Sequence, residues 1–132
     1  MTTPSDLFEL LETDRRYAPR AYAFVLEALR HAQVKLGRME QPEEKARHVT
    51  AKELLDALRD LATEQFGLLA VTVLNGWGVR STSDVGEIVF NLVRARHMSK
   101  TESDQRRDFD EVYDFEDVFR RQFKFEIGDP EL

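Results

Sequence analysis

The stretch that decides the fold spans residues 49–67 and reads VTAKELLDALRDLATEQFG. Thr50 and Glu53 form a capping box, in which the hydroxyl and the carboxylate each accept a hydrogen bond from a free backbone N–H at the start of a helix. Leucine and alanine then recur at three- and four-residue steps, and Gly67 suits the end of the helix. The pattern predicts an amphipathic helix over residues 50–66.

Helix signals continue on both sides of this stretch. Pro19 suits a first helical position and Gly37 a helix end, so a second long helix is predicted between them. Residues 81–84 read STSD, which is typical of a helix cap, and an apolar stripe follows them. A shorter helix is predicted after a cap at Thr3, with Pro4 in its first position, and another after a cap at residues 114–117. Residues 68–75 are either a short buried helix, which we favour, or a strand, because Val71, Thr72 and Val73 are β-branched.

The predicted fold class is all-α, a compact bundle of five or six helices around one core. With 132 residues, the chain is expected to form a single domain, residues 1–132. Residues 122–127 are the one candidate for a short extended C-terminal segment. The residues expected in the core are Leu26, Leu29, Leu58, Leu61, Ile88, Val89 and Leu92.

Charge is distributed unevenly along the chain. Residues 1–100 carry 14 acidic and 14 basic side chains, whereas residues 101–132 carry 11 acidic and five basic ones and therefore hold the whole net charge of −6. An acidic end repels phosphate, so we expect no nucleic-acid partner. The chain has no cysteine, no run of about 20 apolar residues and no signal-peptide pattern, so we expect a cytoplasmic protein without a membrane span.

Several short strings between residues 77 and 115 stand out, namely WGVRSTSD, GEIVFNLV, MSKT, DF and VYDF. On these strings, residues 50–119 resemble a family of short, uncharacterised bacterial proteins. The resemblance implies a compact domain. It carries no activity, cofactor or catalytic residue, and it assigns no function to these positions.

The C-terminal run from Phe109 to Phe125 interleaves aromatic with acidic residues. Such a run can dock into a groove on a partner, or it can fold back and cover the chain's own helices. Trp77, which lies between two glycines, is either an exposed anchor for a partner or a core residue. The candidate partner-binding residues are Trp77, Phe109, Tyr113, Phe115 and Phe119.

Sequence motifs for catalysis are missing from the chain. Neither a nucleophile elbow nor a glycine-rich phosphate loop occurs, and the three histidines lack metal-ligand spacing. We therefore expect a non-catalytic helical module for protein–protein interaction or self-association, with no cofactor, rather than an enzyme.

Two alternatives stay open. The segments 68–75 and 83–96, joined by a glycine turn, resemble a DNA-binding helix-turn-helix, although acidic Asp84 and Glu87 stand where base contacts are needed. The phosphate contacts would come from Arg80, Arg94, Arg96 and Lys100.

The second alternative is a metal-dependent enzyme that uses carboxylates. On a helix, Asp104, Asp108 and Glu111 would share one face, and paired carboxylates bind Mg²⁺ or Ca²⁺. Arginines in the same segment favour a solvated, salt-bridged acidic face instead.

Overall fold

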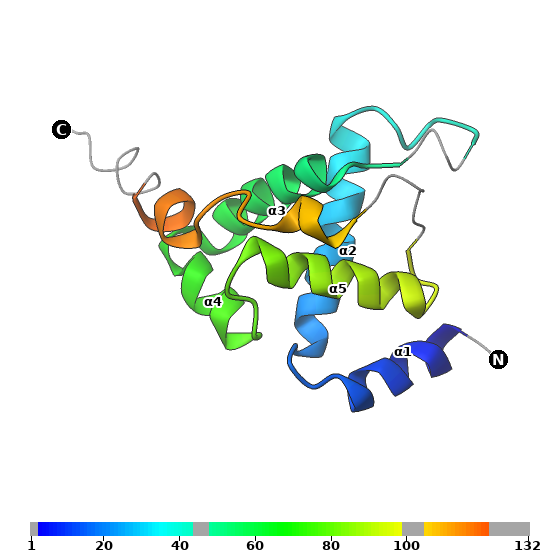
Figure 1. Cartoon of the computed structure of the whole chain (residues 1–132). Coiled ribbons are helices and arrows are strands. Elements are labelled where there is room, and N and C mark those ends of the chain that lie inside the picture. The colour runs from blue at the N-terminus through cyan, green and yellow to red at the C-terminus, as the bar shows by residue number, and fades with distance from the viewer. Residues whose placement is uncertain (1–2, 44–47, 99–104, 122–132) are drawn as a thin grey trace.

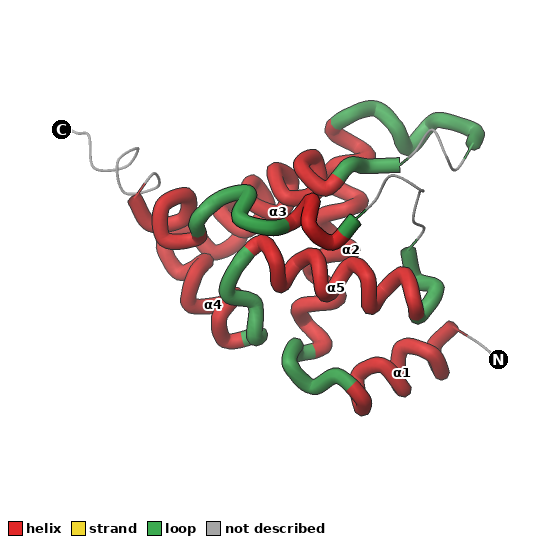
Figure 2. Tube along the Cα trace, viewed as in Figure 1, coloured by secondary structure: helices red, strands yellow, loops and turns green. Residues whose placement is uncertain are grey.

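Every regular element in the described part of the chain is helical (Figure 2). The computed structural model describes residues 3–43, 48–98 and 105–121, with side chains from residue 8 onward. The elements are α1 (Thr3–Thr13), α2 (Pro19–Lys35), α3 (Ala51–Phe66), the 3-10 turn η2 (Gly67–Leu69), α4 (Ala70–Gly76), α5 (Thr82–Arg94), the 3-10 turn η3 (Arg106–Phe109) and the π-helical turn η4 (Glu116–Arg121). The all-α prediction is confirmed, while the candidate extended segment 122–127 lies outside the described residues.

The capping box at the start of α3 forms as predicted. The Thr50 hydroxyl accepts from the Glu53 N–H at 3.1 Å, and the Glu53 carboxylate accepts from the Thr50 N–H at 3.0 Å. Arg38, from the connection that follows α2, donates to both oxygens of Glu53 at 2.6 and 3.0 Å, which holds the pKa of that carboxyl below its usual range. One carboxylate thus caps α3 and fixes the loop before it.

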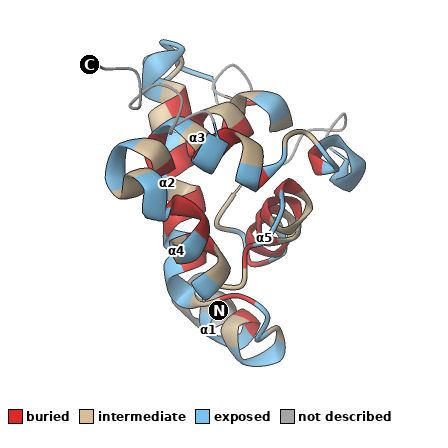
Figure 3. Ribbon diagram, turned by 90° about the vertical axis from the view of Figure 1, so that its left-hand side faces the viewer, coloured by how far each residue is buried: buried red, intermediate tan, exposed pale blue. Residues whose placement is uncertain are grey.

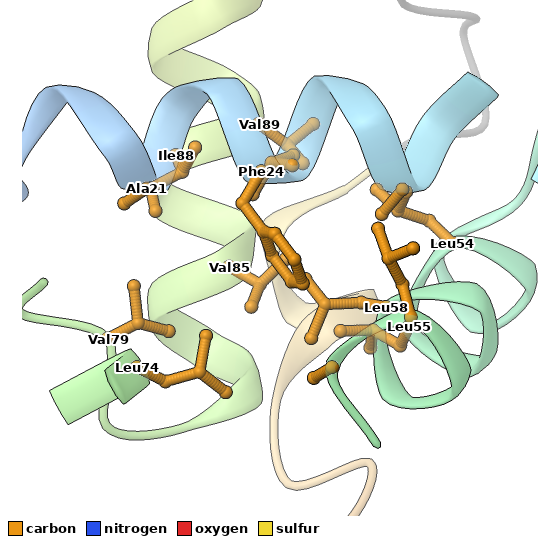
Figure 4. Packing of buried hydrophobic residues seen from close by; sticks show 14 of the residues in the cluster. Ala21, Phe24, Leu54, Leu55, Leu58, Leu74, Val79, Val85, Ile88 and Val89 are labelled. Carbon is orange, nitrogen blue, oxygen red and sulfur yellow. The ribbon is translucent and has the colours of Figure 1, made fainter. Parts of the chain in front are cut away.

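The core lies where α2 crosses α3 and α5 (Figure 1). Phe24 of α2, Leu55 and Leu58 of α3 and Val85 of α5 converge there (Figure 4). Five of the residues expected in the core are buried: Leu58, Leu61, Ile88, Val89 and Leu92.

Leu26 and Leu29 were also expected in the core, and this is wrong, because they are only partly buried. The buried residues of α2 are instead three large ones and three alanines, namely Tyr22, Phe24, Val25, Ala21, Ala28 and Ala32. Small side chains let neighbouring helices approach closely, so the two leucines lie at the flank of the contact rather than at its centre.

The segment 105–121, which we name the C-terminal strap, lies across α3 and α5 (Figure 1). Phe109 packs directly on Gly86 of α5, where an added Cβ would lie 2.8 Å from the Phe109 Cβ. The buried Thr82 hydroxyl accepts from the Val112 N–H at 3.2 Å, and the Tyr113 hydroxyl donates to the Leu55 carbonyl at 2.7 Å. The strap is therefore part of the packed domain.

The turn between α4 and α5 rests on the connection between α1 and α2. Gly78 has a φ of +95°, and a Cβ added there would lie 2.0 Å from the Arg16 carbonyl oxygen. Beside it, the Ala18 N–H donates to the Trp77 carbonyl at 3.0 Å. This contact positions Trp77 against α2.

The cap of α5 differs from the prediction. Ser81 occupies the N-cap, but its side chain makes no capping hydrogen bond. Asp84 in the first turn accepts instead from the Arg80 N–H at 2.9 Å and from the Tyr17 hydroxyl at 2.6 Å. Across the described residues, no helix combines the length and the apolar character that crossing a membrane requires.

Candidate functional site

Trp77 sits at the surface end of an aromatic cluster. Its ring centroid lies 5.5 Å from that of Phe24 and 5.7 Å from that of Phe66. Phe24 is buried, whereas Phe66 and Trp77 are each partly exposed. The Arg20 guanidinium lies over the indole at 5.8 Å. The cluster thus anchors a tryptophan rigidly while leaving part of its ring in solvent.

Apolar side chains extend this exposed surface along α4. Leu69, Val73 and Trp77 follow one another at four-residue steps, so they lie along one side of the helix. The other side of α4, with Ala70, Val71 and Leu74, faces the core. Leu69 is 64 % exposed, although leucine is usually buried. We name the residues Phe66, Leu69, Val73 and Trp77 the Trp77 face, and Figure 3 shows how buried and exposed residues alternate around α4.

The strap residues predicted to bind a partner are not at the surface. Phe109, Phe115 and Phe119 are buried in the core, and Tyr113 is partly buried with its hydroxyl bound to α3. Burial raises the pKa of Tyr113 above its usual range. The expectation that these residues form an exposed docking arm is therefore wrong. As far as residue 121 the segment covers the chain's own helices, and residues 122–125 lie outside the described residues.

A buried polar cluster links α5 to the connection between α1 and α2. Asn91 is 1 % exposed, and its amide donates to the Asp14 carboxylate at 3.0 Å and to the Tyr22 hydroxyl at 3.1 Å. Arg16 pairs with the same carboxylate at 2.7 Å, which holds the pKa of Asp14 well below its usual range. Arg94 donates to the Asn91 oxygen. Because each polar group of Asn91 has a partner, the cluster fixes the end of α5.

An open depression of about 500 Å³ lies beside this cluster. It is lined by Glu9, Leu10, Thr13, Asn91, Arg94, Ala95 and Arg96. The first three come from α1 and the others from α5 and the turn that ends it, so the depression lies between these two helices (Figure 1).

The basic residues proposed for DNA contact do not form one surface. Arg80 precedes α5, whereas Arg94 and Arg96 lie at its far end, about 20 Å away at 1.5 Å per residue. Lys100 lies outside the described residues. Within α5 itself, Arg94 alone is exposed, and the η3 turn of the strap covers one side of the helix. A recognition helix needs a free polar face for a DNA groove, and α5 offers none.

The carboxylates proposed as metal ligands have structural contacts or stand apart. Asp108 accepts from the Gln105 N–H at 3.1 Å and so caps η3, while Glu111 is exposed at a φ of +50°. Asp104 lies outside the described residues. Within the ranges that the structure describes, no three histidine, aspartate or glutamate side chains are grouped as a metal ion requires.

The sequence analysis did not identify Leu69 as part of an exposed apolar surface, and it did not identify Glu9 as a residue that lines the depression. Leu69 could have been found, because an apolar residue on the side of a short helix opposite its buried stripe is a visible signal. Glu9 could not, since the residues that face it from the end of α5, such as Arg94, are more than 80 residues away along the chain.

Comparisons of the chain with models of protein families, with curated proteins and with solved structures find no match. The resemblance of residues 50–119 to a bacterial family stays a prediction, and the candidate surfaces rest on the geometry of this chain.

Proposed function

We propose that the protein is a non-catalytic helical module that binds a protein partner through the Trp77 face. The observation that carries the proposal is a partly exposed tryptophan that packs on both Phe24 and Phe66, together with a Leu69 that is exposed eight residues earlier, at the start of α4. Tryptophan and arginine dominate the energetics of protein interfaces, and a rigidly held ring loses little conformational entropy on binding. The cytoplasmic location stays a prediction.

The side chains of the Trp77 face indicate which types of residue a partner needs in order to bind there. Leu69 and Val73 supply apolar area, so the partner needs an apolar side chain to lie between them and the indole. Arg20 at the edge of the ring is exposed and has five N–H donors, so a carboxylate on the partner completes the contact. The expected partner is therefore a protein segment with apolar residues beside an acidic one.

The two alternatives draw less support from the geometry. Among the described residues proposed for DNA contact, Arg80 lies at one end of α5 and Arg94 and Arg96 lie at the other, so these three do not form a continuous basic surface. For the carboxylate enzyme, the described residues contain no group of three metal-ligating side chains, and Asp108 caps η3.

A photo-crosslinking experiment tests the proposal. A photoreactive phenylalanine replaces Leu69 in one chain and Leu36 in a control chain, since Leu36 is an exposed leucine (43 %) at the end of α2. The proteins captured in cells are identified, and the affinity of the purified partner is then measured for Leu69→Asp and Leu36→Asp. We expect at least a tenfold loss of affinity for Leu69→Asp and no change for Leu36→Asp.

Equal crosslinking from both positions, or equal affinities of the two aspartate variants, would refute the proposal. Crosslinking of the chain to itself, with a dimer in sedimentation analysis that Leu69→Asp disrupts, would instead identify self-association as the interaction made by this face.

A further inference from the structure

The geometry points to a second binding site, in which the depression between α1 and the end of α5 takes a small molecule that carries both a carboxylate and an amine. The depression is about 500 Å³, which lies within the usual range for small-molecule sites. It lies at the opposite end of α5 from Trp77, so the inference is independent of the proposed protein interaction.

The two walls of the depression carry opposite charges. The wall from α1 carries the Glu9 carboxylate, and the wall from α5 carries the Arg94 and Arg96 guanidinium groups. Within the described part of the chain, the side chains of Glu9 and Arg96 form no hydrogen bond or ion pair with each other or with a third residue. A ligand with a negative group at one end and a positive group at the other would satisfy both walls together.

One of the arginines is held in position. Arg94 donates to the oxygen of buried Asn91, and Asn91 is itself fixed by Asp14 and Tyr22. The remaining N–H groups of the guanidinium are left for a carboxylate, which an arginine binds through two parallel hydrogen bonds. Leu10 and Ala95 provide an apolar floor for the carbon chain of the ligand.

The second arginine, Arg96, has a backbone conformation that favours glycine. Arg96 has a φ of +65° in the turn that closes α5, where the His97 N–H donates to the Leu92 carbonyl at 2.8 Å. α2 ends in the same kind of turn, and there the position is occupied by Gly37 with a φ of +70°. A side chain kept in a left-handed conformation is strained, and such strain is typical of functional positions. The guanidinium of Arg96 in the depression gives this position a reason to carry arginine rather than glycine.

The test is an NMR titration of the full-length chain with amino acids of increasing length: glycine, 4-aminobutanoate and 6-aminohexanoate. Butanoate and butylamine serve as probes that carry only one of the two charges. We expect at least one amino acid to shift the amide signals of Thr13 and Asn91 and to bind at least fivefold more tightly than either single-charge probe.

Three variants separate a binding role from a structural one. Arg96→Gly should weaken amino-acid binding at least fivefold while the melting temperature stays the same or rises, because glycine relieves the strained turn. Glu9→Gln should abolish the preference for an amino acid over butanoate. Arg30→Ala, which removes an exposed arginine from α2, should leave binding unchanged.

No binding by any of the three amino acids, or affinity equal to that of butanoate, would overturn the inference. Unchanged binding by Arg96→Gly would overturn it as well, since this variant is expected to remain folded.

Discussion

Replacing each of two neighbouring glycines by alanine should change the free energy of unfolding in opposite directions. Gly76 ends α4, and an added Cβ there meets no atom within 4 Å. Gly78 has a φ of +95°, and an added Cβ would lie 2.0 Å from the Arg16 carbonyl oxygen. Gly76→Ala is therefore expected to stabilise the fold, and Gly78→Ala to destabilise it strongly.

The magnitudes follow from the two environments. Alanine in place of glycine in a helix lowers the entropy of the unfolded chain and stabilises by about 0.5–1 kcal/mol. At Gly78, a left-handed backbone with a Cβ costs about 1–2 kcal/mol. The overlap with a backbone oxygen must also be relieved by moving the turn or the α1–α2 connection, at about 1–3 kcal/mol. The total expected for Gly78→Ala is thus about 2–5 kcal/mol.

Urea denaturation followed by circular dichroism and by the fluorescence of Trp77, the single tryptophan, measures both variants. We expect the midpoint to rise for Gly76→Ala and to fall for Gly78→Ala. Midpoints that agree within error would refute the packing of the turn on Arg16, because the substitution is chemically the same at both positions.

Three further perturbations test other parts of the fold. Phe119→Ala removes a ring with 0 % exposure and should lower the free energy of unfolding by about 3–5 kcal/mol in the same urea assay, and a loss below about 1 kcal/mol would show that the strap is not packed as described. Arg96→Gly should raise the free energy of unfolding by about 1 kcal/mol, and a decrease would contradict the strained turn. Because Arg16 holds the pKa of the Asp14 carboxyl well below its usual range, the stabilisation from Asp14 is present above about pH 4 and is lost as the pH falls below that value. The melting temperature should therefore drop less between pH 5 and pH 2 for Asp14→Asn than for the natural chain. An equal drop in both proteins would show that the Asp14 carboxylate does not stabilise the fold.

Local signals were sufficient to predict the helices of this fold. The capping box of Thr50 and Glu53 and the end signal of Gly37 involve residues a few positions apart, so they can be read from the chain directly. The prediction was less accurate for α2, because the choice between its leucines and its alanines depends on how closely another helix approaches. That distance is set by residues of α3 and α5 far away in the sequence.

The candidate sites were harder to predict for the same reason. An aromatic and acidic segment has the same composition whether it binds a partner or covers its own core. The contact that decides between them joins Tyr113 to Leu55, 58 residues earlier. Asn91 gave no signal, since its partners Asp14 and Tyr22 are 77 and 69 residues away. Trp77 was a candidate from its sequence alone, but its aromatic neighbours come from two other helices, Phe24 from α2 and Phe66 from α3, and only the folded chain brings them together.

The central claim is that the C-terminal strap covers the core of its own chain and leaves the Trp77 face for a partner. The most direct test is an NMR measurement of nuclear Overhauser effects between the Phe109 ring and the Gly86 α-protons, in a mixture of isotope-labelled and unlabelled chains. We expect strong nuclear Overhauser effects between these two residues of one chain and none between different chains. Effects only between chains, or none at all, would contradict it.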